Sequence, residues 1–243
     1  MNKKNPAIEK TFALAYQNHQ KNNLEIAENL YNEILKINPN HFESIFLLGT
    51  LSAQFKKFNI SKQLLLKATQ IQPNNIHVHN NLGNVLKELG EYQKAIDYYE
   101  KVIQIDSNFG QAHSNLGVVQ KELGEYQKAI DYYEKAIKIN SNYAEAYYNL
   151  GNVQSFLGEY NEANKTYRQA IKIKSDYTKA YSNLLFNLNY KKDCDPDLFL
   201  SEAKKFRINC GPKKKLSIKY QYEKVPTKLK IGCVSADFGD HPG

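Results

Sequence analysis

Four asparagines stand 34 residues apart, at Asn81, Asn115, Asn149 and Asn183. A carboxamide carries both a hydrogen-bond donor and an acceptor, so it can pair with a peptide group whatever the neighbouring side chain is. If each asparagine lies on its own helix, with helices roughly 8–10 Å apart, one asparagine meets about every third residue of an extended chain, which rises ~3.3 Å per residue. The spacing predicts that these residues bind the backbone of an extended polypeptide. The alternative is that asparagine only packs at this position.

A candidate for acid–base chemistry lies near the end of the sequence. His241 stands in the segment Asp237-Phe238-Gly239-Asp240-His241-Pro242. The imidazole is the one side chain whose unperturbed pKa is close to neutral pH, which suits a general acid or base. The alternative is a loop histidine that only hydrogen-bonds its neighbours.

The histidines of the central region have a structural interpretation. His79 and His113 stand 34 residues apart, and tyrosines, Tyr147 and Tyr181, follow at the same spacing. We therefore expect these positions to pack between helices. His77 and His79 are not expected to form a metal pair, because residues two apart point to different sides of a helix. No metal site is predicted.

The spacing of all these residues follows from an internal repeat. The segment KELGEYQKAIDYYEK occurs at 87–101 and again at 121–135. A period of 34 residues is that of the tetratricopeptide repeat, a helix–turn–helix unit. Repeats are expected over 8–190, as five full units at 8–41, 42–75, 76–109, 110–143 and 144–177 with an incomplete sixth at 178–190.

Recurring residue types within the units indicate how the helices pack. Small residues recur where two helices cross, and leucine and tyrosine recur between them; the glycines are Gly49, Gly83, Gly117 and Gly151, and the tyrosines are Tyr31, Tyr99, Tyr133 and Tyr167. Gly90, Gly124 and Gly158 are expected in the left-handed conformation that ends a helix. Ser107, Ser141 and Ser175 are expected to cap the helices that follow them. Over about 180 residues the chain resembles the tetratricopeptide family, which implies an all-α right-handed superhelix.

Composition and charge narrow the class of partner. Residues 1–190 hold 21 Lys and Arg against 18 Asp and Glu, whereas residues 191–243 hold 12 against 7. The repeat region is therefore close to neutral, and no nucleic-acid partner is expected, since binding phosphates needs a basic stripe. No apolar run approaches the ~18 residues of a membrane span, and no signal peptide is evident. The three cysteines have no paired spacing. We expect a cytoplasmic protein without a membrane partner.

The period changes after the repeats. Asp195-Pro196 is expected to start a helix through about Arg207, followed by a basic linker, so that 191–227 connects two regions. The segment 228–243 contains the β-branched stretch 229–235 and then a Gly/Asp/Pro loop, which is typical of the first strand of an α/β domain. One strand cannot form a sheet, so we expect 228–243 to be the start of a truncated catalytic domain.

The passage from the repeats to this strand resembles a known enzyme family. The segments 182–190 and 229–242 are similar to the junction between repeats and catalytic region in O-GlcNAc transferases, above all their SPINDLY-like branch. The resemblance implies a parent enzyme that moves a sugar from a nucleotide donor, typically UDP-GlcNAc, to Ser or Thr of proteins bound by the repeats. It implies an active-site position for His241 and a peptide-binding ladder formed by the four asparagines on the concave face of the superhelix. The chain by itself is expected to hold no cofactor and to transfer no sugar.

A non-enzymatic adaptor or scaffold is the alternative. Some tetratricopeptide proteins bind a terminal carboxylate with lysine at the fifth position of a unit and asparagine at the ninth. Here the ninth position has Asn84 and Asn152, but the fifth has Asn80, Ser114 and Tyr148. Because the lysines are missing, this arrangement fits the chain less well than the asparagine ladder.

Overall fold

The computed structural model describes residues 5–190 and 196–211, and within them every regular element is an α-helix. The expected strand at 229–235 lies outside these residues. The helices are α1 (Pro6–Gln20), α2 (Leu24–Ile37), α3 (Phe42–Gln54), α4 (Phe58–Ile71), α5 (Ile76–Glu88), α6 (Tyr92–Ile105), α7 (Gly110–Glu122), α8 (Tyr126–Ile139), α9 (Ala144–Phe156), α10 (Tyr160–Ile173), α11 (Thr178–Tyr190) and α12 (Pro196–Cys210).

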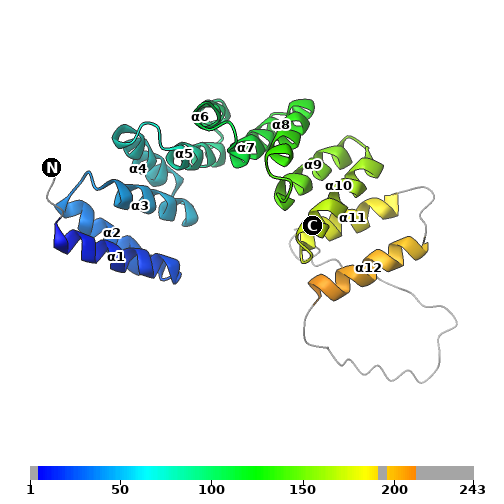
Figure 1. Cartoon of the computed structure of the whole chain (residues 1–243), viewed down its shortest axis with the longest axis horizontal. Coiled ribbons are helices and arrows are strands. Elements are labelled where there is room, and N and C mark those ends of the chain that lie inside the picture. The colour runs from blue at the N-terminus through cyan, green and yellow to red at the C-terminus, as the bar shows by residue number, and fades with distance from the viewer. Residues whose placement is uncertain (1–4, 191–195, 212–243) are drawn as a thin grey trace, which may run out of the picture. The chain divides into compact units, whose positions relative to one another are not determined.

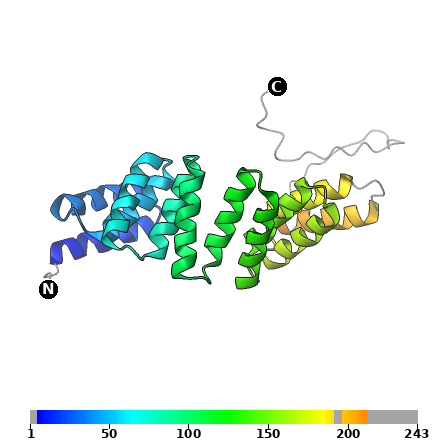
Figure 2. The ribbon, with the colours of Figure 1, turned by 90° about the horizontal axis from the view of Figure 1, so that it is seen from above.

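The helices form antiparallel pairs that repeat along the chain. From α3 onward, the first helices of the pairs begin 34 residues apart, at Phe42, Ile76, Gly110, Ala144 and Thr178. Each first helix packs on the second helix of its own pair and on the second helix of the preceding pair. Figures 1 and 2 show the pairs following one another in chain order.

Glycine lies where the two helices of a pair are closest. A Cβ atom on Gly83 would stand 2.6 Å from Cε1 of Tyr99, and one on Gly117 would stand 2.6 Å from Cε1 of Tyr133. Real Cβ atoms essentially never come so close. Both tyrosine rings are fully buried. The recurring pair of glycine and tyrosine is therefore one steric unit, in which the missing side chain makes room for the ring.

The turns inside the pairs use left-handed backbone. Gly90, Gly124 and Gly158 have φ of 74°, 78° and 82°, as expected from the sequence. Asn22 and Lys56 hold the same place in the first two pairs, with φ of 61° and 57°. Asparagine tolerates this conformation, whereas lysine is rarely found in it. The second pair therefore keeps a strained residue where the later pairs have glycine.

The expected serine caps are not formed at the starts of α7 and α9. Helix α7 begins at Gly110 with Phe109 as N-cap, and α9 begins at Ala144 with Tyr143 as N-cap; neither N-cap residue makes a side-chain cap bond. Ser107 and Ser141 lie two residues before these caps, too early to reach the free N–H groups of the first turn. Of the three central first helices α5, α7 and α9, α5 alone has a side-chain cap, in which Asn75 Oδ1 accepts from the N–H groups of His77 and Val78.

The first helices form a continuous surface. Neighbouring first helices contact one another directly, α3 with α5, α5 with α7, α7 with α9 and α9 with α11. Figure 1 shows α3, α5 and α7 along the inner side of the arc, and α4, α6 and α8 along its outer side. The core lies between the two sets, where apolar side chains from both helices of each pair are buried. Side chains on the inner side are thus brought together from several repeats.

The last described helix packs against the incomplete sixth repeat. Phe206 of α12 lies 5.7 Å from the ring of Tyr181 on α11, and Asn209 donates to the Tyr181 hydroxyl at 2.7 Å. Glu202 is buried and lies 3.5 Å from Nε of Arg168 on α10. The sequence predicts that this helix ends near Arg207. It runs to Cys210, and Asn209 in its last turn is hydrogen-bonded to α11.

Candidate peptide-binding surface

The four asparagines lie on consecutive first helices. Asn81 belongs to α5, Asn115 to α7, Asn149 to α9 and Asn183 to α11, and each residue is half-buried. Because these four helices contact one another in series, the asparagines share one surface. They are placed at equivalent turns of their helices, one repeat apart.

Their hydrogen bonds divide them into two kinds. Asn115 donates from Nδ2 to Oδ1 of Asn80 on the preceding repeat, at 2.9 Å. Asn183 donates from Nδ2 to Oδ1 of Asn152 on the preceding repeat, at 2.8 Å. The side chains of Asn81 and Asn149 make no hydrogen bond to any residue in the described ranges. Two asparagines thus bridge repeats, and the two that alternate with them have neither donor nor acceptor engaged by a described residue.

A second set of asparagines lies over the buried tyrosines. Tyr99 donates its hydroxyl to Oδ1 of Asn84 at 2.7 Å, and Tyr167 donates to Oδ1 of Asn152 at 3.0 Å. Burial raises the pKa of Tyr167 to about 12 and raises the pKa of Tyr99 further, so both hydroxyls remain protonated donors. Since the Asn84 oxygen is occupied by a donor, its NH₂ group is the part left for a ligand.

The fourth repeat lacks this arrangement. Val118 takes the place that Asn84 has in the third repeat and Asn152 in the fifth. The Tyr133 hydroxyl is buried there and has no hydrogen-bond partner among the described residues. The third and fourth repeats share the segment KELGEYQKAIDYYEK. They differ above the tyrosine, where the third has a polar side chain and the fourth an apolar one.

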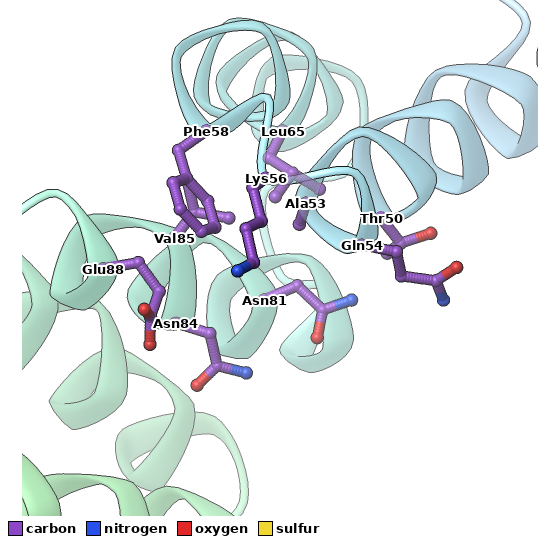
Figure 3. A pocket seen from close by; sticks show the side chains of 10 residues that line it. All are labelled: Thr50, Ala53, Gln54, Lys56, Phe58, Leu65, Asn81, Asn84, Val85 and Glu88. Atoms are coloured by element: carbon purple, nitrogen blue, oxygen red, sulfur yellow. The ribbon is translucent and has the colours of Figure 1, made fainter. Parts of the chain in front are cut away.

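A groove of about 440 Å³ lies at the N-terminal end of this surface, between α3 and α5 (Figure 3). Its apolar wall comes from Ala53, Phe58, Leu65 and Val85, and its polar rim from Thr50, Gln54, Lys56, Asn81, Asn84 and Glu88. Figure 3 shows Lys56 reaching from the α3–α4 turn toward α5. The groove thus joins one free asparagine of the ladder to an apolar wall and a cation.

The repeat histidines are packing residues, as expected. His79 Nε2 contacts the carbonyl oxygen of Pro73 at 2.6 Å, and His113 Nε2 contacts that of Ser107 at 3.3 Å. Both rings are buried, and burial lowers the pKa of each imidazole. Their Nε2 atoms donate to a carbonyl, which leaves Nδ1 without a partner in either ring among the described residues. No cluster of potential metal ligands is found in the part of the chain that the structure describes.

One predicted site residue lies outside the described residues. His241 and its segment 237–242 belong to the range 212–243, so the predicted catalytic position cannot be compared with this surface. Lys56 lines the groove, and the sequence pattern did not single it out. Its signal is the absence of glycine at a turn where three later repeats have one. The sequence pattern also did not indicate that Asn80 bridges two repeats, because its hydrogen-bond partner, Asn115, lies 35 residues away.

Comparison with known proteins supports the repeat assignment. The family model described as tetratricopeptide repeat matches residues 75–142 and 109–176. A search of curated proteins returned no match. None of the helices in the described ranges has the length and apolar character that a membrane crossing requires.

Several solved structures share the fold. The MamA protein is 26% identical, with a TM-score of 0.60 over 71% of this chain and 94% of that one. PilF of Pseudomonas aeruginosa is 19% identical, with a TM-score of 0.70 over 84% of this chain and 91% of that one. YrrB, described as a tetratricopeptide protein with an unusual peptide-binding site, is 20% identical, with a TM-score of 0.57 over 73% and 95%. The chain therefore contains tetratricopeptide repeats, and its described residues form an all-helical repeat array.

Proposed function

We propose that the inner surface of the array binds polypeptide in an extended conformation through its asparagines. The observation that carries this proposal is a pair of carboxamides, Asn81 and Asn149, on a surface that several repeats share; neither has a hydrogen-bond partner among residues 5–190 and 196–211. A half-buried amide without a partner can gain a hydrogen bond from a ligand without first breaking one inside the protein. Peptide backbone offers the matching donors and acceptors at every residue other than proline.

The two bridging asparagines have a different part in the proposal. Asn115 uses one N–H to hold Asn80, which is 3% exposed, and the Asn115 Oδ1 atom has no donor among the described residues. It can therefore accept from a peptide N–H while it stabilises the contact between repeats. Loss of this side chain would leave the buried Asn80 oxygen unpaired, which costs stability as well as binding.

The test compares two double variants. N81A/N149A should weaken binding of capped twelve-residue peptides by about fivefold or more, whatever their sequence, because each lost neutral hydrogen bond contributes about 0.5–1.5 kcal/mol. Its melting temperature should not fall, since alanine is the better helix former. N115A/N183A should lower both the affinity and the melting temperature.

The matched control is N59A/N161A. Asn59 and Asn161 are exposed and lie on the second helices α4 and α10, away from the inner surface. Fluorescence anisotropy with labelled peptides should give the wild-type affinity for this control. An N81A/N149A protein that is fully folded and binds like the control would remove the ladder from the mechanism.

In its wider context, we propose that the array presents protein substrates to a glycosyltransferase of the O-GlcNAc transferase type. This rests on the resemblance of residues 182–190 and 229–242, and it implies a nucleotide-sugar donor such as UDP-GlcNAc and a role for His241. Radiolabelled UDP-GlcNAc, incubated with protein substrate and a chain carrying the complete transferase region, should label the substrate.

A non-enzymatic adaptor has equal support from the repeat fold, and YrrB shows that a peptide-binding site occurs on this architecture. Both functions require the same peptide-binding surface. In the transferase assay, N81A/N149A should lower labelling of protein substrates, and H241A should lower labelling while peptide binding stays unchanged. Peptide binding by a complete chain that labels no protein would favour the adaptor.

A further inference from the structure

We infer that the groove between α3 and α5 recognises an acidic side chain of the bound peptide, together with an apolar residue two positions away. The inference rests on the proposed function, because the groove borders the ladder at Asn81. It adds sequence preference to a surface that otherwise holds only backbone.

Lys56 is the residue that distinguishes this groove. The next residue, Lys57, pairs with Glu28 at 2.8 Å, and Glu88 on the far rim pairs with Lys87 at 2.7 Å. Among the described residues Lys56 has no carboxylate partner, and its side chain is exposed. Within the described part of the groove, the uncompensated charge on the rim is therefore positive.

The backbone of Lys56 indicates that the side chain is retained for a reason other than folding. Its φ of 57° is a conformation that glycine adopts freely, and glycine holds this place in the third, fourth and fifth repeats. A lysine there is strained, and such residues cluster at binding sites. The turn would fold better with glycine, so the cation is what the lysine adds.

The neighbouring amide completes a site for a carboxylate. Asn84 lines the groove, and its Oδ1 atom accepts from the Tyr99 hydroxyl at 2.7 Å, which leaves its NH₂ group without a partner among the described residues. Asn81 provides a second carboxamide without a partner inside the described ranges. One ammonium and fixed N–H donors match the two oxygens of an Asp or Glu side chain, since a charged hydrogen bond is stronger than a neutral one.

The apolar wall of the groove determines which peptide residue is preferred two positions from the carboxylate. Leu65 and Val85 are buried at its base, and Ala53 and Phe58 are half-buried beside them. Alternate residues of an extended chain point to the same side. A peptide that places a carboxylate at Lys56 therefore directs the residue two positions away to this wall, where an aliphatic side chain such as leucine is removed from water.

The experiment measures a ratio of affinities. Twelve-residue peptides, capped at both ends and identical except for a central Leu-Xaa-Glu or Leu-Xaa-Gln, are titrated onto the full chain. The Glu peptide should bind the wild type about tenfold more tightly than the Gln peptide, which corresponds to one charged hydrogen-bonded pair. K56Q and K56G should both reduce this ratio to about one. A third peptide, Ala-Xaa-Glu, should bind more weakly than Leu-Xaa-Glu.

Two controls exclude trivial causes for a loss of the ratio between the Glu-peptide and Gln-peptide affinities. K138Q removes an exposed lysine on α8, a second helix, and should leave the roughly tenfold ratio unchanged. K56G should melt no lower than the wild type, so a lost preference in that variant is not a folding defect. N81A/N149A should weaken both peptides and should not abolish the preference for Glu.

The outcomes separate this inference from the proposed function. Equal affinities of the Glu and Gln peptides for the wild type, or an unchanged ratio in K56Q, would overturn the inference and leave the ladder in place. A peptide with a free C-terminal Leu that depends on Lys56, while the capped Glu peptide does not, would also overturn it in favour of a terminal carboxylate. Absence of binding by every peptide would overturn both proposals.

Discussion

The third and fourth repeats fold alike and present different surfaces. They share the segment KELGEYQKAIDYYEK, the contact of glycine with a buried tyrosine ring, and a buried histidine against a backbone carbonyl. They differ in the residue above the tyrosine, which is Asn84 in one and Val118 in the other. The ladder asparagine of the third repeat makes no hydrogen bond within the described ranges, whereas that of the fourth bridges to its neighbour. The shared residues are those that set the helix packing, and the differing ones lie where a ligand is proposed to bind.

The largest expected effect tests the shared packing. G83A and G117A should each destabilise the protein by about 1–2 kcal/mol, because overpacking against the tyrosine ring costs about 2–3 kcal/mol and the better helix propensity of alanine returns about 1 kcal/mol. G49A should be close to neutral, because its Cβ would meet the flexible Leu65 at 3.1 Å rather than a ring at 2.6 Å. Urea unfolding gives the three values. A G49A protein as unstable as G117A would show that the ring is not the cause.

The residues that differ above the tyrosine, Asn84 in the third repeat and Val118 in the fourth, can be exchanged by mutation. N84V should cost about 1 kcal/mol or more, because it leaves the buried Tyr99 hydroxyl without an acceptor. V118N should add about 0.5–1.5 kcal/mol, because it supplies an acceptor to the Tyr133 hydroxyl. Thermal unfolding of both variants checks the pair. Equal and opposite changes would confirm that the two repeats share one backbone geometry; a destabilising V118N would contradict it.

The general outline of the fold is predictable from the sequence, because it depends on spacing and residue size. The period of 34, the glycines at the helix crossings and the left-handed turn glycines all follow from backbone geometry that only certain residues allow. The prediction that serines cap α7 and α9 was wrong, because a small polar residue near a helix start does not fix which residue becomes the N-cap. Helices α7 and α9 begin later than the serines predict, and Ser107 and Ser141 are left outside them.

The details of the site are less predictable. Spacing identifies the four asparagines, but their division into bridging and free side chains depends on the side chain they face in the preceding repeat. Asn115 meets Asn80, whereas Asn183 meets Asn152, a different position of the unit. The groove at Lys56 depends on how the α3–α4 turn lies against α5, which residue types alone do not specify. The roles of these residues stay proposals that the binding experiments test.

A smaller effect, on the stability of the fold, is expected only in mildly acidic solution. Burial lowers the pKa of His79 and His113 below the usual 6.5, and Lys101 and Lys135 add to the shift. The unfolded chain therefore binds more protons than the folded one once the pH falls below about 6.5, so stability decreases in that range and levels off below the folded pKa. Urea midpoints at about pH 7.5 and 5.5, on either side of the unperturbed pKa, should differ, and H79Y/H113Y should reduce the difference. His19, whose pKa burial also lowers, leaves a residual slope.

The tyrosine replacements have a precedent within the chain. Tyr147 and Tyr181 occupy the equivalent places in the fifth and sixth repeats, and Tyr181 is buried there. The variant should therefore fold at neutral pH. An unchanged pH dependence in a folded H79Y/H113Y protein would assign the acid sensitivity to carboxylates or to His19 instead.

The smallest expected effect concerns the turns, where the second repeat departs from the later ones. K56G should raise stability by a few tenths to about 1 kcal/mol, because glycine accepts the left-handed backbone without strain but loses more entropy on folding. N22G should change stability less, because asparagine already tolerates a φ of 61°. Differential scanning calorimetry of the two variants gives the comparison. A K56G protein that melts lower than the wild type would mean that Lys56 stabilises the fold and that its backbone conformation gives no reason to assign it to a ligand.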